Sequence, residues 1–71
     1  MATLTAYIER DPETGLLVGI IPGVPGAHSQ GATLDELTAN LREALELVLE
    51  EDAGLKERLP QFVGLQQIEV T

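Results

Sequence analysis

Three acidic side chains, at Glu9, Asp11 and Glu13, form the first group in this sequence that could do chemistry. A two-metal nuclease needs several carboxylates that converge on ions about 4 Å apart. Here the acids surround Pro12 and are followed by Gly15, and proline and glycine at this spacing are typical of a turn. We therefore interpret the group as a solvated loop. The alternative is a divalent metal site at Glu9 and Asp11, which would make the chain a nuclease.

His28 is the only histidine, and a histidine can act as a general base near neutral pH. A general base also needs a nucleophile or an activated water within reach. The chain has no cysteine, and Ser29 is adjacent in sequence, which gives no triad geometry by itself. We therefore interpret His28 as a surface or strand-end residue. One histidine and no cysteine also exclude histidine-rich and thiolate metal sites and disulfides.

Gly23, Gly26 and Gly31 do not form a phosphate-binding loop. No lysine follows them, and Asp35 and Glu36 stand at the start of the next helical pattern, where they would repel an anion. The glycines are typical of backbone turns. The sequence therefore predicts no catalytic residue, no metal and no cofactor, and we do not expect an enzyme.

A line of acidic residues on the predicted helix is the feature with most functional promise. The chain has twelve acids and four bases, a net charge of −8. This balance disfavours direct binding to nucleic acid or to anionic membranes, because both need lysine and arginine. A basic partner would be steered to the acidic line; the alternative is a solvated face that keeps a small protein soluble. The candidate partner-binding residues are Asp35, Glu43, Glu46 and Glu50.

The elements that position these residues follow from the spacing of apolar side chains. Residues 4–9 alternate apolar and polar, as a half-buried strand does. Residues 16–21 are apolar and predict the second strand of a hairpin, residues 27–30 a short third strand, and residues 62–70 a last strand. In that last stretch the apolar positions change parity at Gln66-Gln67, which predicts a bulge or kink.

A long helix is the clearest element of the pattern. Thr33 followed by Glu36 is a capping box, and Asp52 stands where the helix should end. Asn40 lies at the margin of the apolar stripe, and we expect its side chain to bond a neighbouring loop. The stripe that should face the core comprises Leu34, Leu37, Leu41, Ala44, Leu45, Val48 and Leu49.

These elements predict an α+β fold with the order β-β-β-α-β. A small antiparallel sheet of three to four strands would carry one long helix on one face. Because the second strand is apolar throughout, its far face also needs cover, and we expect Leu17 and Ile21 to form an oligomer or partner face. The alternative is that a terminal segment folds over that face.

The small size of the chain also favours self-association. Its 71 residues predict a single domain over residues 1–71, and domains below roughly 80 residues usually gain stability from disulfides, a metal or a second subunit. Without cysteines, a homo-oligomer, dimer or tetramer, is the expected solution. The first residues have no basic and apolar regions of a signal peptide, and no apolar run is long enough to span a membrane, so a cytoplasmic location is expected.

Four motifs give the chain a resemblance to a known family. They are Tyr-Ile-Glu at 7–9, Pro-Gly-Val-Pro-Gly at 22–26, Ser-Gln-Gly-Ala-Thr-Leu-Asp-Glu-Leu at 29–37 and Asn-Leu-Arg-Glu-Ala-Leu at 40–45. Together they are similar to the HicB-like antitoxins, the antitoxin half of a bacterial toxin–antitoxin pair, over nearly the whole chain. The resemblance implies a degraded ribonuclease-H-like fold without nuclease carboxylates, and assembly into dimers or larger oligomers. It also implies binding to a small basic ribonuclease toxin whose active site is masked.

The chain departs from the family pattern at a few positions. Ala27 stands where many members have cysteine, Ala32 replaces a common aspartate, and Leu37 a common alanine. Many members continue into a DNA-binding domain, whereas this sequence stops at Thr71, so we expect no C-terminal DNA-binding domain and no autorepression through one.

The function that we infer from the sequence is a non-catalytic, antitoxin-like interaction protein that binds and masks a small basic ribonuclease toxin. The alternative is an orphan oligomeric scaffold, or a small-ligand-binding protein of the same fold, that has lost its toxin partner.

Overall fold

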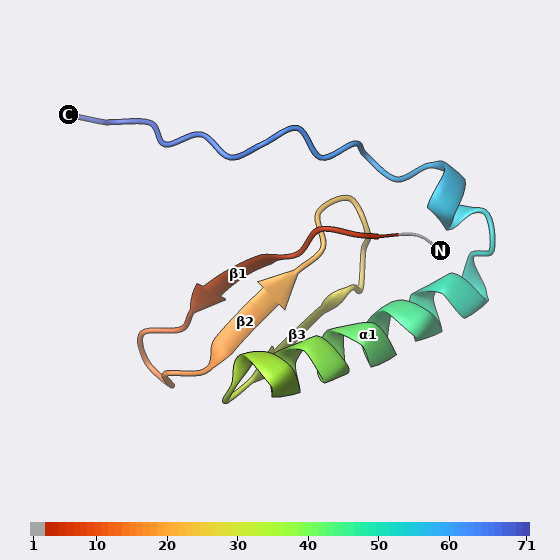
Figure 1. The fold of residues 1–71 in the computed structure, drawn as a ribbon, viewed down its shortest axis with the longest axis horizontal. Helices are drawn as coiled ribbons and strands as arrows, with labels where there is room; N and C mark the ends of the chain where they lie inside the picture. The colour runs from red at the N-terminus through yellow and green to blue at the C-terminus, as the bar shows by residue number, and fades with distance from the viewer. Residues whose placement is uncertain (1–2) are drawn as a thin grey trace.

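Three short strands and one long helix form the ordered elements of the chain, in a computed structural model that describes residues 3–71 (Figure 1). The strands make one antiparallel sheet in the order β1-β2-β3. The predicted α+β class, a small antiparallel sheet followed by one long helix, is confirmed. The elements are β1 (Tyr7–Arg10), β2 (Leu17–Ile20), β3 (His28–Gly31), α1 (Leu34–Glu51) and the short 3-10 helix η1 (Leu55–Glu57).

The turn between β1 and β2 is held by its own polar side chains. The carboxylate of Asp11 accepts hydrogen bonds from the backbone N–H of Glu13 at 3.2 Å and from the hydroxyl of Thr14 at 2.9 Å. Gly15 has a φ of 76°, the left-handed conformation that returns the chain, within the turn that Pro12 and Gly15 predict. The guanidinium of Arg10 donates to the carbonyl of Gly15 at 2.8 Å. The side-chain oxygens of Asp11 therefore stabilise the turn itself.

The Pro-Gly segment between β2 and β3 places three apolar side chains in the core. The N–H of Ile21 donates to the carbonyl of Ala27 at 2.9 Å, and the N–H of Ala27 donates to the carbonyl of Val24 at 3.1 Å. These bonds close a compact loop at the end of the hairpin. Its buried side chains, Ile21, Val24 and Ala27, form a core cluster with Leu55.

α1 begins and ends where the sequence predicts. The hydroxyl of Thr33 accepts a hydrogen bond from the N–H of Glu36 at 3.1 Å, and Asp52 caps the other end. Asn40 donates from Nδ2 to the carbonyl of Gln30 at 2.8 Å, so the predicted structural bond is made, but to strand β3 and not to a loop, and it ties the helix to the sheet.

The contact between α1 and the sheet depends on small residues in the strands. The buried Leu37 and Leu41 approach β2 at Gly19, where an added Cβ would lie 2.7 Å from Leu41 Cδ1. Gly19 pairs with Ser29 of β3, and directly paired residues of antiparallel strands point to the same face. Small residues at these positions let α1 pack closely on β2 and β3 (Figure 1). Leu34, predicted to belong to the core stripe, is instead 56% exposed.

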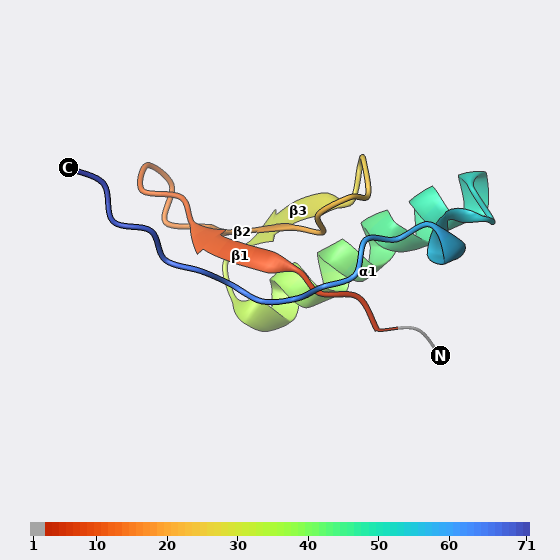
Figure 2. The same cartoon turned by 90° about the horizontal axis from the view of Figure 1, so that it is seen from above.

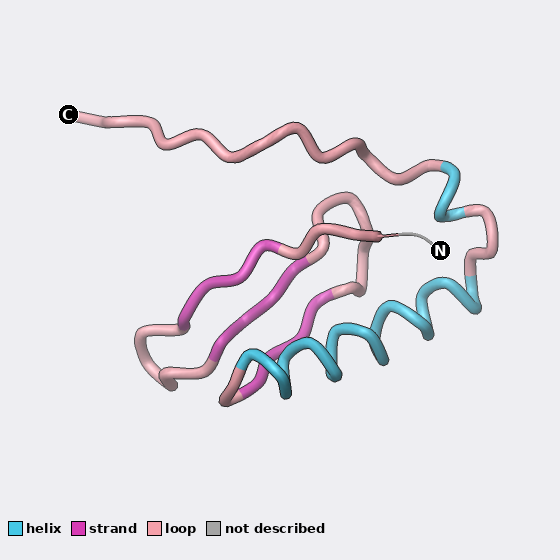
Figure 3. The backbone as a smooth tube through the Cα atoms, viewed as in Figure 1, coloured by secondary structure: helices cyan, strands magenta, loops and turns pink. Residues whose placement is uncertain are grey.

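The predicted last strand over residues 62–70 is not formed. The C-terminal segment, residues 59–71, follows η1 without any assigned strand or helix (Figure 3). It runs beside β1 and parallel to it in both views of the fold (Figures 1 and 2). Because no strand pairs with it within residues 3–71, the bulge predicted at Gln66-Gln67 is not formed either. Among the described residues, no helix combines the length and apolar character that crossing a membrane requires.

Candidate interaction surfaces

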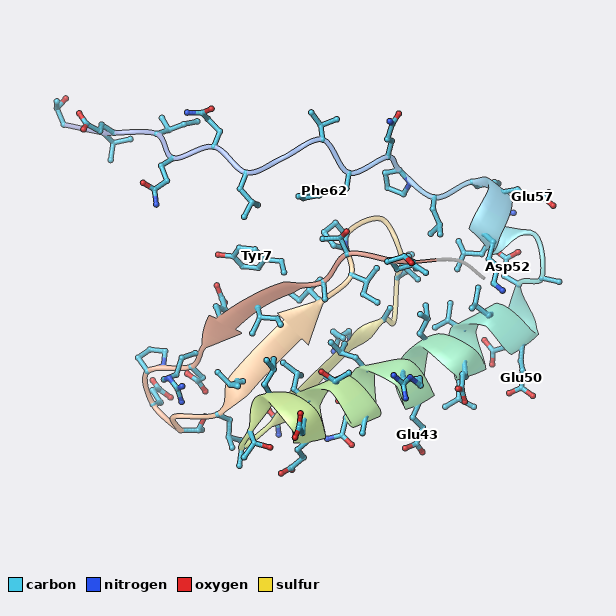
Figure 4. The ribbon with its side chains drawn as sticks, viewed as in Figure 1. Tyr7, Glu43, Glu50, Asp52, Glu57 and Phe62 are labelled. Carbon is cyan, nitrogen blue, oxygen red and sulfur yellow. The ribbon has the colours of Figure 1, made fainter. Side chains whose placement is uncertain are left out.

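The exposed side of α1 carries a dense group of carboxylates. Six of its eighteen residues are acidic, and Arg42 is its one basic residue. Glu43 and Glu50 project away from the sheet (Figure 4). The predicted partner-binding residues Asp35, Glu43, Glu46 and Glu50 are all exposed, and we call them the acidic stripe.

The acidic stripe follows from helical spacing. Glu43 and Glu46 are three residues apart and Glu46 and Glu50 four apart, so they are neighbours on one side of the helix. Like charges at this spacing each destabilise a helix by about 0.2–0.5 kcal/mol. Acids near the last turn also oppose the helix dipole, whose negative end lies there. The C-terminal half of the stripe therefore makes α1 less stable than a mixed-charge face would.

An ion pair stands just beyond the acidic stripe, at the end of α1. Arg58 donates to the carboxylate of Asp52, and within residues 3–71 this is the single salt bridge. The hydrogen bond from Arg58 lowers the pKa of Asp52 below its ordinary value. Arg58 thus pairs with the negative charge of Asp52, the C-cap residue. Within residues 3–71 the carboxylates of the acidic stripe have no basic side chain within 4 Å.

The open face of the sheet is formed by residues other than those predicted. Leu17 pairs with Gly31 and shares a face with Gly19, the face toward α1. Ile21 is 7% exposed and belongs to the core cluster. The prediction that Leu17 and Ile21 form an outer face is therefore wrong: because β2 is apolar throughout, alternation could not tell which set the helix covers. The apolar residues on the other face are Tyr7, Val18 and Ile20.

A groove separates the C-terminal segment from β1. It measures about 660 Å³, and its walls come from residues 3–8, the start of the Pro-Gly loop and residues 59–65. Tyr7 and Phe62 lie in the space between the two segments (Figure 4). Pro60, one of the residues that line the groove, lies so close to Gly23 that a Cβ there would be 2.3 Å from Pro60 Cγ.

The C-terminal segment is highly exposed although it is apolar. Val63 is 93% exposed, Leu65 81% and Ile68 79%. The sequence pattern had indicated this segment only as a strand. The sequence signal for an exposed apolar surface was the change of apolar parity within residues 62–70, because this change places apolar side chains on both faces of an extended chain.

The remaining candidates are not brought together as a site. Glu9 and Glu13 are exposed, Asp11 bonds within its own turn, and His28 is exposed opposite Ile20 at the start of β3. Among residues 3–71, no three histidine, aspartate or glutamate side chains are placed to hold a metal ion.

Comparison with known proteins identifies the family. The profile of the "HicB_like antitoxin of bacterial toxin-antitoxin system" matches residues 4–70. A UPF0150 protein of Thermotoga maritima is 54% identical over 66 residues, which are 93% of this chain and 87% of that protein. UPF0150 proteins of Synechocystis and Archaeoglobus fulgidus are 44% and 41% identical, each over 89% of this chain and 87% of their own length. No solved structure gives a significant match.

The family profile covers the sheet, α1 and most of the C-terminal segment, and therefore all the surfaces described above. The relatives match nearly as much of the chain at high identity. The chain belongs to the HicB-like antitoxin family of bacterial toxin–antitoxin systems.

Proposed function

We propose that this chain is a non-catalytic antitoxin that binds a small basic ribonuclease toxin and masks its active site through the acidic stripe of α1. Family membership supports the antitoxin role. The observation that carries the choice of surface is the stripe itself: four exposed carboxylates on one side of one helix, without basic neighbours in ion-pair contact in residues 3–71.

The acidic stripe destabilises α1, and this destabilisation is the reason to assign the stripe a role in binding. Repulsion between Glu43, Glu46 and Glu50 and the opposing helix dipole both destabilise α1, and no ion pair within residues 3–71 compensates. A surface rich in lysine and arginine would relieve both effects on binding. A ribonuclease that binds RNA needs such a basic surface for the phosphates, so an acidic helix laid on it would exclude RNA.

Charge reversal tests this assignment. The double variant Glu43→Lys, Glu46→Lys should slow association with the toxin by about tenfold or more at low salt, because steering by opposite charges raises association rates by 10–1,000-fold. Glu9→Lys, Glu13→Lys is the matched control: it makes the same change of net charge in the exposed first hairpin and should bind nearly as fast as the parent. Surface plasmon resonance at two salt concentrations measures both rates. Equal association rates for the two variants would exclude the stripe.

The partner itself is found by capture. The tagged chain, expressed in its own host, should retain a small basic protein that cleaves RNA when it is alone and not when the chain is added.

A second candidate function is favoured by the groove beside β1. An apolar groove of about 660 Å³ falls in the range of small-molecule sites, so an orphan scaffold or small-ligand-binding protein is the competing proposal. Capture of the chain alone, together with binding of an apolar ligand that quenches Tyr7 fluorescence, would favour this second function over the first.

A further inference from the structure

One large apolar residue stands among the carboxylates of α1. Leu47 is 59% exposed, and it does not belong to the apolar stripe that the helical spacing directs to the core. Residues three and four positions away are neighbours on a helix surface. The neighbours of Leu47 at these positions are Glu43, Ala44, Glu50 and Glu51. Three of the four are acidic, so an exposed leucine side chain lies within a frame of carboxylates.

Leu47 lies on the outer side of α1, away from the core. Glu43 and Glu50, which flank it along the helix, project away from the sheet (Figure 4). Within residues 3–71, Leu47 belongs neither to the buried core nor to the partly buried side chains packed against the core cluster. Neither the groove beside β1 nor the hollow at the Pro-Gly loop includes it. The fold of the single chain therefore leaves this side chain in water.

Helix stability does not explain a leucine at this position. Leucine, glutamine, glutamate and lysine have nearly equal helix propensities. A lysine here would stabilise α1 further, because it would stand four residues from both Glu43 and Glu51 and pair with each. Leucine makes no such pair and leaves the repulsion between the carboxylates in place. An exposed apolar side chain contributes free energy only when another surface removes it from water.

The charges around Leu47 determine the kind of surface that can cover it. A second copy of this face would bring its own glutamates against Glu43 and Glu50, and like charges across an interface are unfavourable. An anionic membrane is repelled by the same carboxylates. A small apolar ligand needs a concave site, and Leu47 borders neither of the two hollows named above. Charge complementarity therefore favours a protein surface that carries lysine and arginine.

We propose that Leu47 is the apolar anchor of the partner-binding face, and that the partner is a basic protein surface with a pocket for one leucine side chain. Glu43 and Glu51 each stand four residues from Leu47, which is a rise of about 6 Å along the helix on either side. The pocket should therefore have a lysine or arginine at about that distance on each side. This inference rests on the proposed function, because the anchor belongs to the same side of α1 as the acidic stripe.

The anchor and the carboxylates contribute to different steps of binding. Attraction between opposite charges acts at long range and raises the association rate. Burial of an apolar side chain acts only at contact distance, so the loss of that contact appears in the dissociation rate. Covering a leucine that is 59% exposed corresponds to a roughly tenfold effect on affinity.

Two synthetic lysine-rich peptides of equal length and charge test the anchor without the toxin. One peptide has leucine at every fourth position, and the other has serine at those positions. Isothermal titration calorimetry should show that the leucine peptide binds the chain about tenfold more tightly than the serine peptide. Leu47→Gln, which preserves charge and helix propensity, should abolish this difference.

Leu34→Gln is the matched control for the peptide measurement. Leu34 is 56% exposed on the same helix, but its neighbours three and four residues away are Leu37 and Thr38, so it lies outside the frame of carboxylates. This variant should keep the tenfold difference between the peptides. Far-ultraviolet circular dichroism checks that α1 is intact in both variants. A difference that persists in Leu47→Gln, or that is absent from the parent chain, would overturn the proposal.

Kinetics with the ribonuclease captured by the tagged chain separate the anchor from the proposed function. Leu47→Gln should raise the dissociation rate about tenfold and leave the association rate nearly unchanged, whereas Glu43→Lys with Glu46→Lys should slow association. If charge reversal changes no rate while the peptide difference still depends on Leu47, the role of the acidic stripe fails and the anchor is retained. If charge reversal slows association while Leu47→Gln leaves dissociation unchanged, the acidic stripe is retained and the anchor is overturned.

Discussion

Gly31→Ala should destabilise the fold sharply, because Gly31 is where β3 runs beneath the first turn of α1. An added Cβ would lie 2.6 Å from the backbone nitrogen of Leu37 and 3.0 Å from its Cα. That nitrogen already donates to the carbonyl of Thr33 at 2.9 Å. The methyl group therefore meets helix backbone that is held in place, and the start of α1 must move away from the sheet.

The magnitude follows from what the methyl group meets. Overpacking costs about 1–3 kcal/mol, and the upper end applies where no side chain can rotate away. Loss of glycine's freedom in the unfolded chain returns about 0.4–1 kcal/mol, so the net cost is about 2 kcal/mol. In a domain of this size, about 4–8 °C of Tm accompanies each kcal/mol, so Tm should fall by roughly 8–16 °C.

Gly19→Ala is the matched comparison for this prediction. Its added Cβ would lie 2.7 Å from Cδ1 of Leu41, the far end of a flexible side chain, so a rotamer change can absorb much of the clash. We expect it to cost about 1 kcal/mol. Thermal and urea unfolding of both variants at one fixed protein concentration measures the difference, so that any association between copies affects both variants under the same conditions. If Gly31→Ala is as stable as Gly19→Ala, the backbone contact is not what limits this position.

Two further predictions concern side-chain bonds: one joins α1 to β3, and the other joins the C-cap residue of α1 to the segment after it. Asn40→Ala removes the donor to the Gln30 carbonyl and should cost about 0.5–1.5 kcal/mol in urea unfolding; unchanged stability would mean that water replaces the bond fully. Arg58→Gln removes the partner that lowers the pKa of Asp52. A lowered folded-state pKa gives stability that is present above the ordinary value of 3.8 and is lost as pH falls through the folded-state value. The variant should therefore be less stable than the parent at neutral pH, with the gap closing in acid; a gap that is independent of pH would contradict this role.

Local patterns in the sequence were enough to predict the elements that depend on neighbouring residues. The spacing of apolar residues and the Thr33 cap fixed α1 to within a residue of its observed bounds, and Gly15 marked the first turn. Asn40 was correctly expected to make a structural bond, but its partner in β3 is ten residues away and could not be read from spacing.

The choice of sheet face needed information from across the strands. β2 is apolar at almost every position, so alternation gives no preference for Leu17 and Ile21 or for Val18 and Ile20. The signal that distinguishes the two faces is small residues on both strands: Gly19 and Gly31 with Ser29 share one face, and only there can a helix approach closely.

The last strand was predicted from its composition alone, but a segment forms a β-strand only when its backbone hydrogen-bonds to a neighbouring strand. Residues 62–70 have the apolar content of a strand, but within residues 3–71 no strand pairs with them, although the outer edge of β1 is free. The acidic stripe, in contrast, was predicted with its exposure correct because α1 itself is regular.

The order of the strands has a consequence for how the chain folds. In β1-β2-β3 each strand pairs with the next one along the sequence, and α1 follows directly and packs back on β3 and β2. Such local connections cost little loop-closure entropy, so this part should fold rapidly, without waiting for residues beyond η1. The C-terminal segment has no strand partner within residues 3–71, so its ordering should not limit how fast that core forms. Refolding of this part should accordingly give one fast phase whose rate is independent of chain concentration.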